Sequence, residues 1–204
     1  MMELNTPTDQ SIATNPSRRS MLRSAGLVGL SGAALAILGG CESMAAQKKA
    51  EAGMHQGDVD ILNIALGLEH QAIAAYQIGA ESGLLQKPVL ETAVTFQSHH
   101  KTHRDALVAT IEKLGGLPVA ASMMDDYAKQ LNAGAITSQG DILALALSLE
   151  KGAADAYLGV IPQFENSDLA QVAGRIAADE AMHWTTLASA TGIMTPKNAL
   201  YFGA

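Results

Sequence analysis

The chain contains one helix pair written twice, and this repeat limits the folds open to it more than any other feature. The segment Asp-Ile-Leu-Asn-Ile-Ala-Leu-Gly-Leu-Glu, which ends at Glu69, returns later in the chain as Asp-Ile-Leu-Ala-Leu-Ala-Leu-Ser-Leu-Glu, which ends at Glu150. A second pair of segments matches at nearly the same offset and aligns His103 with His183. Such self-similarity indicates that each half is one supersecondary unit that buries its apolar face against the other half.

Apolar positions in all four segments recur at steps of three and four residues, which is the period of an amphipathic helix. Only 4% of the residues are aromatic, and few stretches show the alternation of β-branched residues that is typical of strands. We therefore predict an all-α chain. In the first segment the repeating positions are Leu62, Ala65, Glu69, Ala72 and Tyr76.

The lengths of the connections indicate how the four helices are joined. Residues 81–88 and 162–168 are short links, and Ser167 or Asp168 is the predicted N-cap of the last helix. The segment 115–140 between the second and third helices is far longer. Two short hairpins joined by one long crossover are the connectivity of a ferritin-like antiparallel four-helix bundle, which is the fold we predict.

Six polar residues lie on helix stripes that would otherwise be apolar. An isolated buried charge is costly, so each carboxylate must be protonated, paired or bound to a cation. A single polar residue on such a stripe is usually a satisfied core group, but here the pattern holds on all four helices at repeat-equivalent positions. No Lys or Arg lies on these stripes to neutralise the carboxylates. The six residues are Glu69, His100, His103, Glu150, Glu180 and His183.

The spacing of these residues predicts a metal site. Glu180 and His183 are three positions apart and share one helix face, so both can reach the same metal centre. A Glu from each of two helices, with Glu-x-x-His from each of the other two, is the pattern of di-iron and di-manganese carboxylate proteins. Oxygen and imidazole ligands suit iron or manganese, and zinc is compatible. We therefore expect two transition-metal ions as cofactors, with iron as the first choice.

The residues around these positions resemble the bacterial ferritin-like domain family over roughly residues 58–192. The resemblance is carried by Leu68-Glu69-His70 with Ala75-Tyr76, by His99-His100-Lys101-Thr102-His103, by Leu149-Glu150 with Ala156-Tyr157, and by Asp179-Glu180-Ala181-Met182-His183. It implies that the family's ligand positions fall on Glu69, position 100, His103, Glu150, Glu180 and His183.

Position 100 departs from the family pattern, because His100 stands where the family has a bridging Glu. Imidazole does not bridge two metals as a carboxylate does, so one bridge would fall to Glu180 alone, or to water or hydroxide. Two divalent cations against three carboxylates leave a formal charge of +1, whereas four carboxylates would give zero. His99 is an alternative ligand. His100 is preferred because it continues the stripe of His103, so we expect His99 to be solvated or to support a ligand.

Residues 1–40 are predicted to be an export signal and not part of the fold. Residues 17–22 read Ser-Arg-Arg-Ser-Met-Leu, a twin-arginine pattern, and an apolar run follows them. The run ends at Leu-Gly-Gly-Cys41, which resembles the lipobox of bacterial lipoproteins, whose cysteine is acylated. Cleavage after Ala45 is the alternative. We expect a protein exported by the twin-arginine route to the periplasm, where a lipid on Cys41 would anchor it to the membrane.

With 204 residues, the chain has room for one domain of ordinary size and a leader. We expect the export signal at 1–40, a flexible tether at 41–57, the bundle at 58–192 and a C-terminal tail at 193–204. The formal net charge is −7 and no basic stripe is present, which argues against nucleic acid as a partner. Metal ions are the expected partners, and a homodimer is a further candidate.

Two functions are compatible with these residues, and the sequence leaves open whether the protein is an enzyme. The first is an exported di-metal carboxylate protein with an oxidoreductase role, which would handle oxygen, peroxide or metal ions under oxidative stress. The second is a non-enzymatic ferritin-like binding or protective envelope protein with a degenerate metal site. His100 in place of Glu favours the second.

Overall fold

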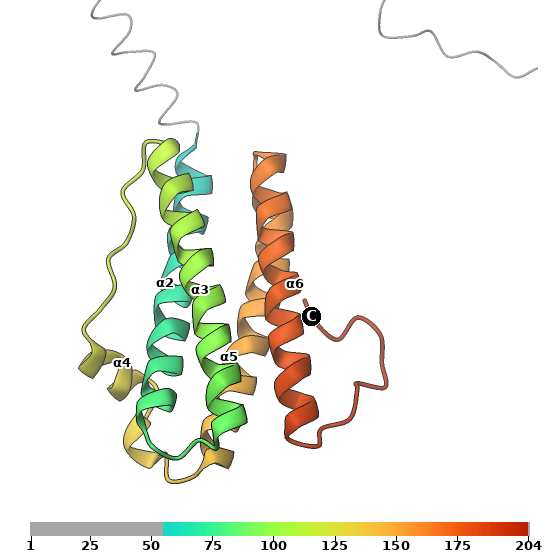
Figure 1. Cartoon of the computed structure of the whole chain (residues 1–204). Coiled ribbons are helices and arrows are strands. Elements are labelled where there is room, and N and C mark those ends of the chain that lie inside the picture. Colours follow the sequence, from blue (N-terminus) through green and yellow to red (C-terminus); the bar gives the residue numbers. More distant parts are fainter. Residues whose placement is uncertain (1–54, 204) are drawn as a thin grey trace, which may run out of the picture. The chain divides into compact units, whose positions relative to one another are not determined.

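The computed structural model describes residues 55–203, and all regular structure within them is helical (Figure 1). The all-α prediction is therefore confirmed for this part of the chain. The predicted export signal, Cys41 and all but the last three residues of the predicted tether lie outside it. The long helices are α2 (Gln56–Glu81), α3 (Lys87–Lys113), α5 (Gln139–Val160) and α6 (Ser167–Ala190), and the short elements are α4 (Met124–Gln130), η1 (Ala133–Ala135) and η2 (Ile161–Gln163).

Side-chain caps determine where two of the long helices begin. The hydroxyl of Ser138 accepts a hydrogen bond from the backbone N–H of Asp141 at the start of α5. At the start of α6, Asn166 accepts from the N–H of Asp168 at 2.8 Å. The predicted N-cap at Ser167 or Asp168 was therefore wrong, because the amide oxygen of Asn166 already satisfies the first turn. Each such cap contributes about 1 kcal/mol.

The long helices pair as two hairpins. Figure 1 shows α2 beside α3, and α5 beside α6, and α2 also contacts α5. Tyr76 lies against Phe96, with ring centroids 6.2 Å apart, while Glu69, earlier on α2, meets His100, later on α3. The two helices of the first hairpin therefore run in opposite directions. None of the helices within residues 55–203 is long and apolar enough to cross a membrane.

Two apolar clusters hold the helices together and leave a layer between them. The fully buried side chains of Leu66, Leu107 and Ile111 belong to the first, and each contributes about 1.5–3 kcal/mol by leaving water. Along each long helix, the predicted polar positions fall between residues of the first cluster and residues of the second. The first comprises Val59, Leu62, Ala65, Leu66, Leu107, Ile111, Tyr157, Leu169, Ala173, Ile176 and Ala177; the second comprises Tyr76, Ala93, Phe96, Leu143, Leu147, Trp184, Leu187 and Ala188.

The predicted C-terminal tail folds back on the hairpin of α5 and α6. The rings of Tyr201 and Phe202 lie 5.0 and 5.4 Å from the ring of Trp184, between centroids. The N–H of Gly203 donates to Oδ1 of Asp155 at 2.8 Å. These aromatic contacts bury Trp184, which is a packing residue here.

Candidate metal centre

All six predicted site residues converge in the layer between the two apolar clusters. None of them has more than 6% of its surface exposed. They form two groups, in each of which one potential ligand atom per residue lies within 4.8 Å of the others. The first group is Glu69, His100, His103 and Glu180, and the second is His100, Glu150, Glu180 and His183.

His100 and Glu180 belong to both groups, and the remaining residues belong to one. In the first group, Nδ1 of His103 lies 3.2 Å from Oε1 of Glu180 and 3.6 Å from Oε1 of Glu69. In the second group, Nδ1 of His183 lies 3.2 Å from Oε2 of Glu150 and 3.4 Å from Oε2 of Glu180. The ring atom Nδ1 of each of these two histidines thus points into the centre of its group.

Three of the inward-facing atoms have no hydrogen-bond partner among the described residues. They are Nδ1 of His103 and both carboxylate oxygens of Glu180. Oε1 of Glu180 lies close to His103, but the two groups are not aligned as a hydrogen bond. A buried polar group without a partner costs about 1–3 kcal/mol, and more when it is charged. A cation placed among these oxygen and nitrogen atoms would remove that cost, so the residues fit a metal of the iron, manganese or zinc type.

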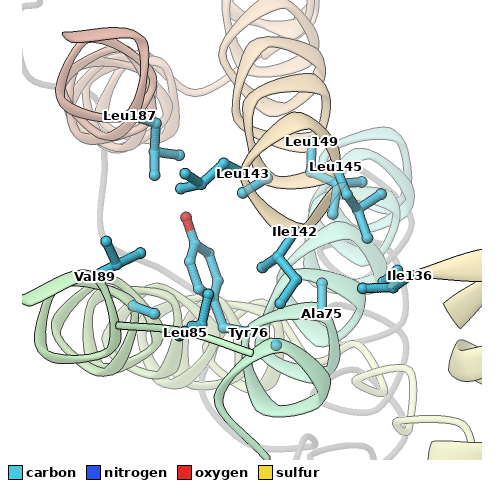
Figure 2. Close-up of a pocket in the computed structure, with 13 residues that line it drawn as sticks. Ala75, Tyr76, Leu85, Val89, Ile136, Ile142, Leu143, Leu145, Leu149 and Leu187 are labelled. Carbon is cyan, nitrogen blue, oxygen red and sulfur yellow. The ribbon is translucent and has the colours of Figure 1, made fainter. Parts of the chain in front are cut away.

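Two tyrosines hold the outer carboxylates in place. The hydroxyl of Tyr157 donates to Oε1 of Glu69 at 2.6 Å, and the hydroxyl of Tyr76 donates to Oε1 of Glu150. Burial and the neighbouring carboxylate raise the pKa of each phenol well above its ordinary value, so both remain hydrogen-bond donors. The ring of Tyr76 also lines an apolar pocket, in which Figure 2 shows Leu143, Val89 and Leu187 around it. This pocket offers the hydroxyl no polar partner, so its hydrogen bond goes to Glu150.

Comparison with known proteins agrees with this helical fold. The ferritin-like domain family matches residues 57–192. The chain belongs to this family. The fold is similar to the crystal structure of a conserved hypothetical protein, rv2844, from Mycobacterium tuberculosis, with a TM-score of 0.57 and 22% identity over 75% of this chain and 99% of that chain. At this identity the likeness concerns the fold alone. No curated protein matches the chain.

The outer nitrogens of two histidines in this ferritin-like domain also have partners. Nε2 of His103 lies 3.2 Å from Oδ2 of Asp179, and Nε2 of His183 lies 2.9 Å from Nδ1 of His99. Burial, together with the charge of His183, lowers the pKa of His99, so its ring is neutral and Nδ1 accepts from His183. Such outer contacts fix the tautomer and orientation of a metal-binding imidazole.

His99 and Asp179 are equivalent in the repeat, and each supports the histidine of the other half. Our sequence analysis did not single out Asp179 as a site residue and left His99 between a solvated and a supporting role. The alignment that pairs His103 with His183 also pairs His99 with Asp179, so the repeat could have identified both as residues that support a ligand.

The charges of the ferritin-like centre balance without a metal. Burial disfavours the protonated form of His100, but contacts with Glu150 and Glu69 outweigh it and raise its pKa to about 10. The pKa of His103 also rises to about 10, since Glu180 and Glu69 outweigh the effect of burial. Burial opposes ionisation of Glu69 and Glu150, yet the imidazoles lower both pKa values, whereas burial raises that of Glu180. A metal ion must therefore displace protons from these imidazoles when it binds.

A cavity between α2 and α5 reaches the centre from one side. It has a volume of about 210 Å³, and both His100 and Glu150 line it. Since a water molecule occupies about 30 Å³ of liquid, the cavity has room for several such molecules. The other lining residues are Leu68, Gln71, Ala72, Ser148, Leu149, Gly152, Ala153 and Ala156.

Proposed function

We propose that the chain is an exported ferritin-like protein whose carboxylate and histidine side chains hold two transition-metal ions. Iron is the first choice, with manganese or zinc as alternatives, and the role is that of an oxidoreductase that handles oxygen or peroxide under oxidative stress. The observation that carries the proposal is the buried carboxylate of Glu180, which has no hydrogen-bond partner among the described residues and lies between the two ligand groups. The proposal treats α2, α3, α5 and α6 as an antiparallel four-helix bundle, with residues 114–138 as the crossover.

Each proposed ion would take its ligands mainly from one hairpin. Glu69 and His103 would hold one ion, Glu150 and His183 the other, and Glu180 would contact both. Such ions, when bound, supply Lewis acidity and, in the case of iron or manganese, a change of oxidation state. The two apolar clusters would exclude bulk water from this layer and strengthen every charge interaction in it.

The surrounding residues would prepare the site for small reactants. Tyr157 and Tyr76 orient the outer carboxylates, while Asp179 and His99 orient the imidazoles. The cavity between α2 and α5 would admit a molecule the size of dioxygen or hydrogen peroxide to the side where His100 lies.

A second function is favoured by the self-balancing charges of the site. His100 contacts Glu69 through Nδ1 at 2.8 Å and Glu150 through Nε2 at 3.2 Å. When doubly protonated, this ring carries one positive charge and donates a hydrogen bond to each of the two carboxylates without a metal. The alternative is therefore a non-enzymatic binding or protective envelope protein whose metal site is degenerate.

One experiment separates the two functions. The full chain would be purified from its native host without chelators, its metal content measured by mass spectrometry, and its optical spectrum recorded in reduced and oxidised forms. We expect about two transition-metal ions per chain and turnover of hydrogen peroxide or dioxygen. Stoichiometric metal without turnover would favour the binding protein. If the purified chain holds no stoichiometric metal and His103→Ala changes nothing, the metal-site proposal fails.

The proposed location is the periplasm, with a lipid anchor at Cys41. The twin-arginine pattern at residues 17–22 and the lipobox-like segment that ends at Cys41 support it, and both lie outside the described residues. The twin-arginine route exports folded proteins, which is compatible with metal insertion in the cytoplasm before export. A homodimer is a candidate assembly.

A further inference from the structure

The two residues that belong to both ligand groups, His100 and Glu180, each direct one potential ligand atom toward each group. Glu180 presents Oε1 to His103 at 3.2 Å and Oε2 to His183 at 3.4 Å. His100 presents Nδ1 to Glu69 at 2.8 Å, and the same atom lies 3.6 Å from Oε1 of Glu180. Its other nitrogen, Nε2, lies 3.2 Å from Oε1 of Glu150. One ring nitrogen of His100 therefore faces each group, as one oxygen of Glu180 does.

We propose that His100 bridges the two metal ions as an imidazolate, with Nδ1 in the first ligand group and Nε2 in the second. The inference rests on the proposed two-metal function and deepens it. The expectation that imidazole cannot take the place of the bridging carboxylate holds for the neutral ring, which has one free lone pair. As each ring nitrogen binds an ion, it gives up its proton to water in the cavity that His100 lines, and its lone pair forms the new bond.

The charge count supports this bridge. Two divalent cations with three carboxylates leave a formal charge of +1, and an imidazolate supplies the fourth negative charge that brings the sum to zero. His100 is 1% exposed and Glu180 is 0% exposed, so an uncompensated charge beside them would be expensive. An imidazolate at position 100 thus supplies a fourth anionic ligand.

The neighbouring rings hold the imidazole of His100 in the orientation that the bridge requires. The ring of Tyr76 lies 5.4 Å away at 30° to it, and the rings of His103 and His183 lie 5.8 and 5.2 Å away with their planes steeply inclined. Packed on three sides, the ring keeps a nitrogen toward each group.

An imidazolate bridge sets the distance between the ions. With metal–nitrogen bonds of about 2.0–2.1 Å on either side of the ring, the ions lie about 6 Å apart. Two-metal sites in which oxygen atoms bridge the ions have a separation of about 3.5–4 Å. The two arrangements are therefore distinguishable by a single distance.

The test is a crystal structure of the full chain loaded with Mn²⁺, in which anomalous scattering at the manganese edge locates the ions. We expect two peaks about 6 Å apart, with the ring of His100 between them. In His100→Glu the separation should contract to about 3.5–4 Å, and in His100→Gln, which removes the bridge, no pair of peaks about 6 Å apart should form. His70→Gln, which changes a histidine bound to the backbone of Val119, is the control and should retain both peaks at the wild-type distance.

Three other outcomes would count against the imidazolate bridge. Two peaks about 3.5–4 Å apart in the wild type would overturn the bridge and leave the two-metal function intact. Two peaks about 6 Å apart in His100→Gln would also overturn it, because the separation would not depend on the ring. No manganese at the site would count against the bridge and the proposed function together.

A measurement in solution does not require that the variants crystallise. The full chain would be loaded with two equivalents of Cu²⁺ and its electron paramagnetic resonance spectrum recorded. We expect the spectrum of a magnetically coupled pair in the wild type and of isolated copper in His100→Gln. Two bound copper ions with an isolated-ion spectrum in the wild type would contradict the bridge.

Discussion

Tyr157 on α5 donates a 2.6 Å hydrogen bond to Oε1 of Glu69 on α2, from one half of the repeat to the other. Tyr76 on α2 makes the equivalent contact to Glu150 on α5. The phenol of each half thus completes the ligand environment of the opposite half. Because both phenols have strongly raised pKa values, they hold the carboxylates in place as donors across the physiological pH range.

The first prediction concerns this pair of hydrogen bonds. Tyr157→Phe removes a buried bond to a charged acceptor, so the free energy of unfolding of the metal-free protein should fall by about 1.5–3 kcal/mol. Metal affinity should fall by about 10–100-fold, because Glu69 loses the group that orients it. Urea denaturation and a competitive metal titration measure the two effects. Tyr127→Phe, which removes a buried hydroxyl that accepts from the N–H of Ser122, is the control and should leave metal affinity unchanged.

The second prediction separates the ligand groups. Glu69→Gln should lower the affinity of the first group for its ion, and Glu150→Gln should lower that of the second group. Each variant should therefore retain about one ion per chain. Glu180→Gln should lose both, because Glu180 belongs to both groups. Metal analysis after dialysis measures the content, with Glu112→Gln, an exposed position on α3, as the control. Equal losses in all three site variants would contradict two separate groups.

The third prediction concerns His99, which lies one residue outside the ligand stripe. His99→Ala removes the acceptor for the outer nitrogen of His183 and should weaken metal binding by about 10–100-fold. His99→Asp introduces a carboxylate at the position equivalent to Asp179 and should bind metal at least as well as the wild type. Ser98→Ala, at the exposed neighbouring position, is the control. The same competitive titration applies, and an unchanged affinity in His99→Ala would assign this residue to packing alone.

The fourth prediction is the pH dependence of the metal-free protein. The pKa values of His100 and His103 rise from 6.5 to about 10 in the folded state, so their stabilising effect is full below pH 6.5 and is lost as the pH rises toward 10. The lowered pKa values of Glu69 and Glu150 stabilise the fold above pH 4.5 and cease to do so as the pH falls through their folded values. The raised pKa of Glu180 stabilises the fold below pH 4.5, and this contribution is lost as the pH rises through its folded value.

Thermal unfolding in a chelator should therefore show maximal stability between about pH 4.5 and 6.5, with a decline toward pH 10. The metal-loaded protein should instead gain stability from about pH 5 to 8, because metal binding requires deprotonated imidazoles. His103→Gln should flatten the decline of the metal-free protein at high pH. A melting temperature that rises between about pH 6.5 and 9 in the chelator would contradict the charge balance described for the centre.

The fifth prediction concerns export. Replacement of both Arg18 and Arg19 by Lys should retain the protein in the cytoplasm of its host, as cell fractionation would show. Cys41→Ala should release the protein from the membrane fraction into the soluble periplasm, because no lipid can be attached. Membrane association that persists in Cys41→Ala would favour cleavage after Ala45 together with some other anchor.

The repeat predicted the long helices and marked the six polar residues that the structure brings together, because helical period and buried charge can both be read along the chain. The outer contacts could not be predicted in the same way. His99 and Asp179 lie one residue off the stripe, and whether they meet a ligand depends on how each helix is rotated about its axis. The nitrogen that His100 turns to each group depends on a side-chain rotamer, which no spacing encodes.

The C-terminal segment shows a different limit. Tyr201 and Phe202 pack on Trp184 without any periodic pattern, so the sequence indicated only a C-terminal tail. Their docking depends on an aromatic surface that exists only after α6 has folded. Aperiodic segments of this kind are visible in the three-dimensional contacts and not in the order of residues.

The sharing of His100 and Glu180 between the ligand groups has a consequence for the chain as a whole. Each group takes three residues from one hairpin and a single residue from the other, and the crossover between the hairpins contributes none. If a protease cut the crossover at an inserted site, the two hairpins should behave as complementing fragments. A transition metal should then strengthen the association of the two halves, and a chelator should weaken it.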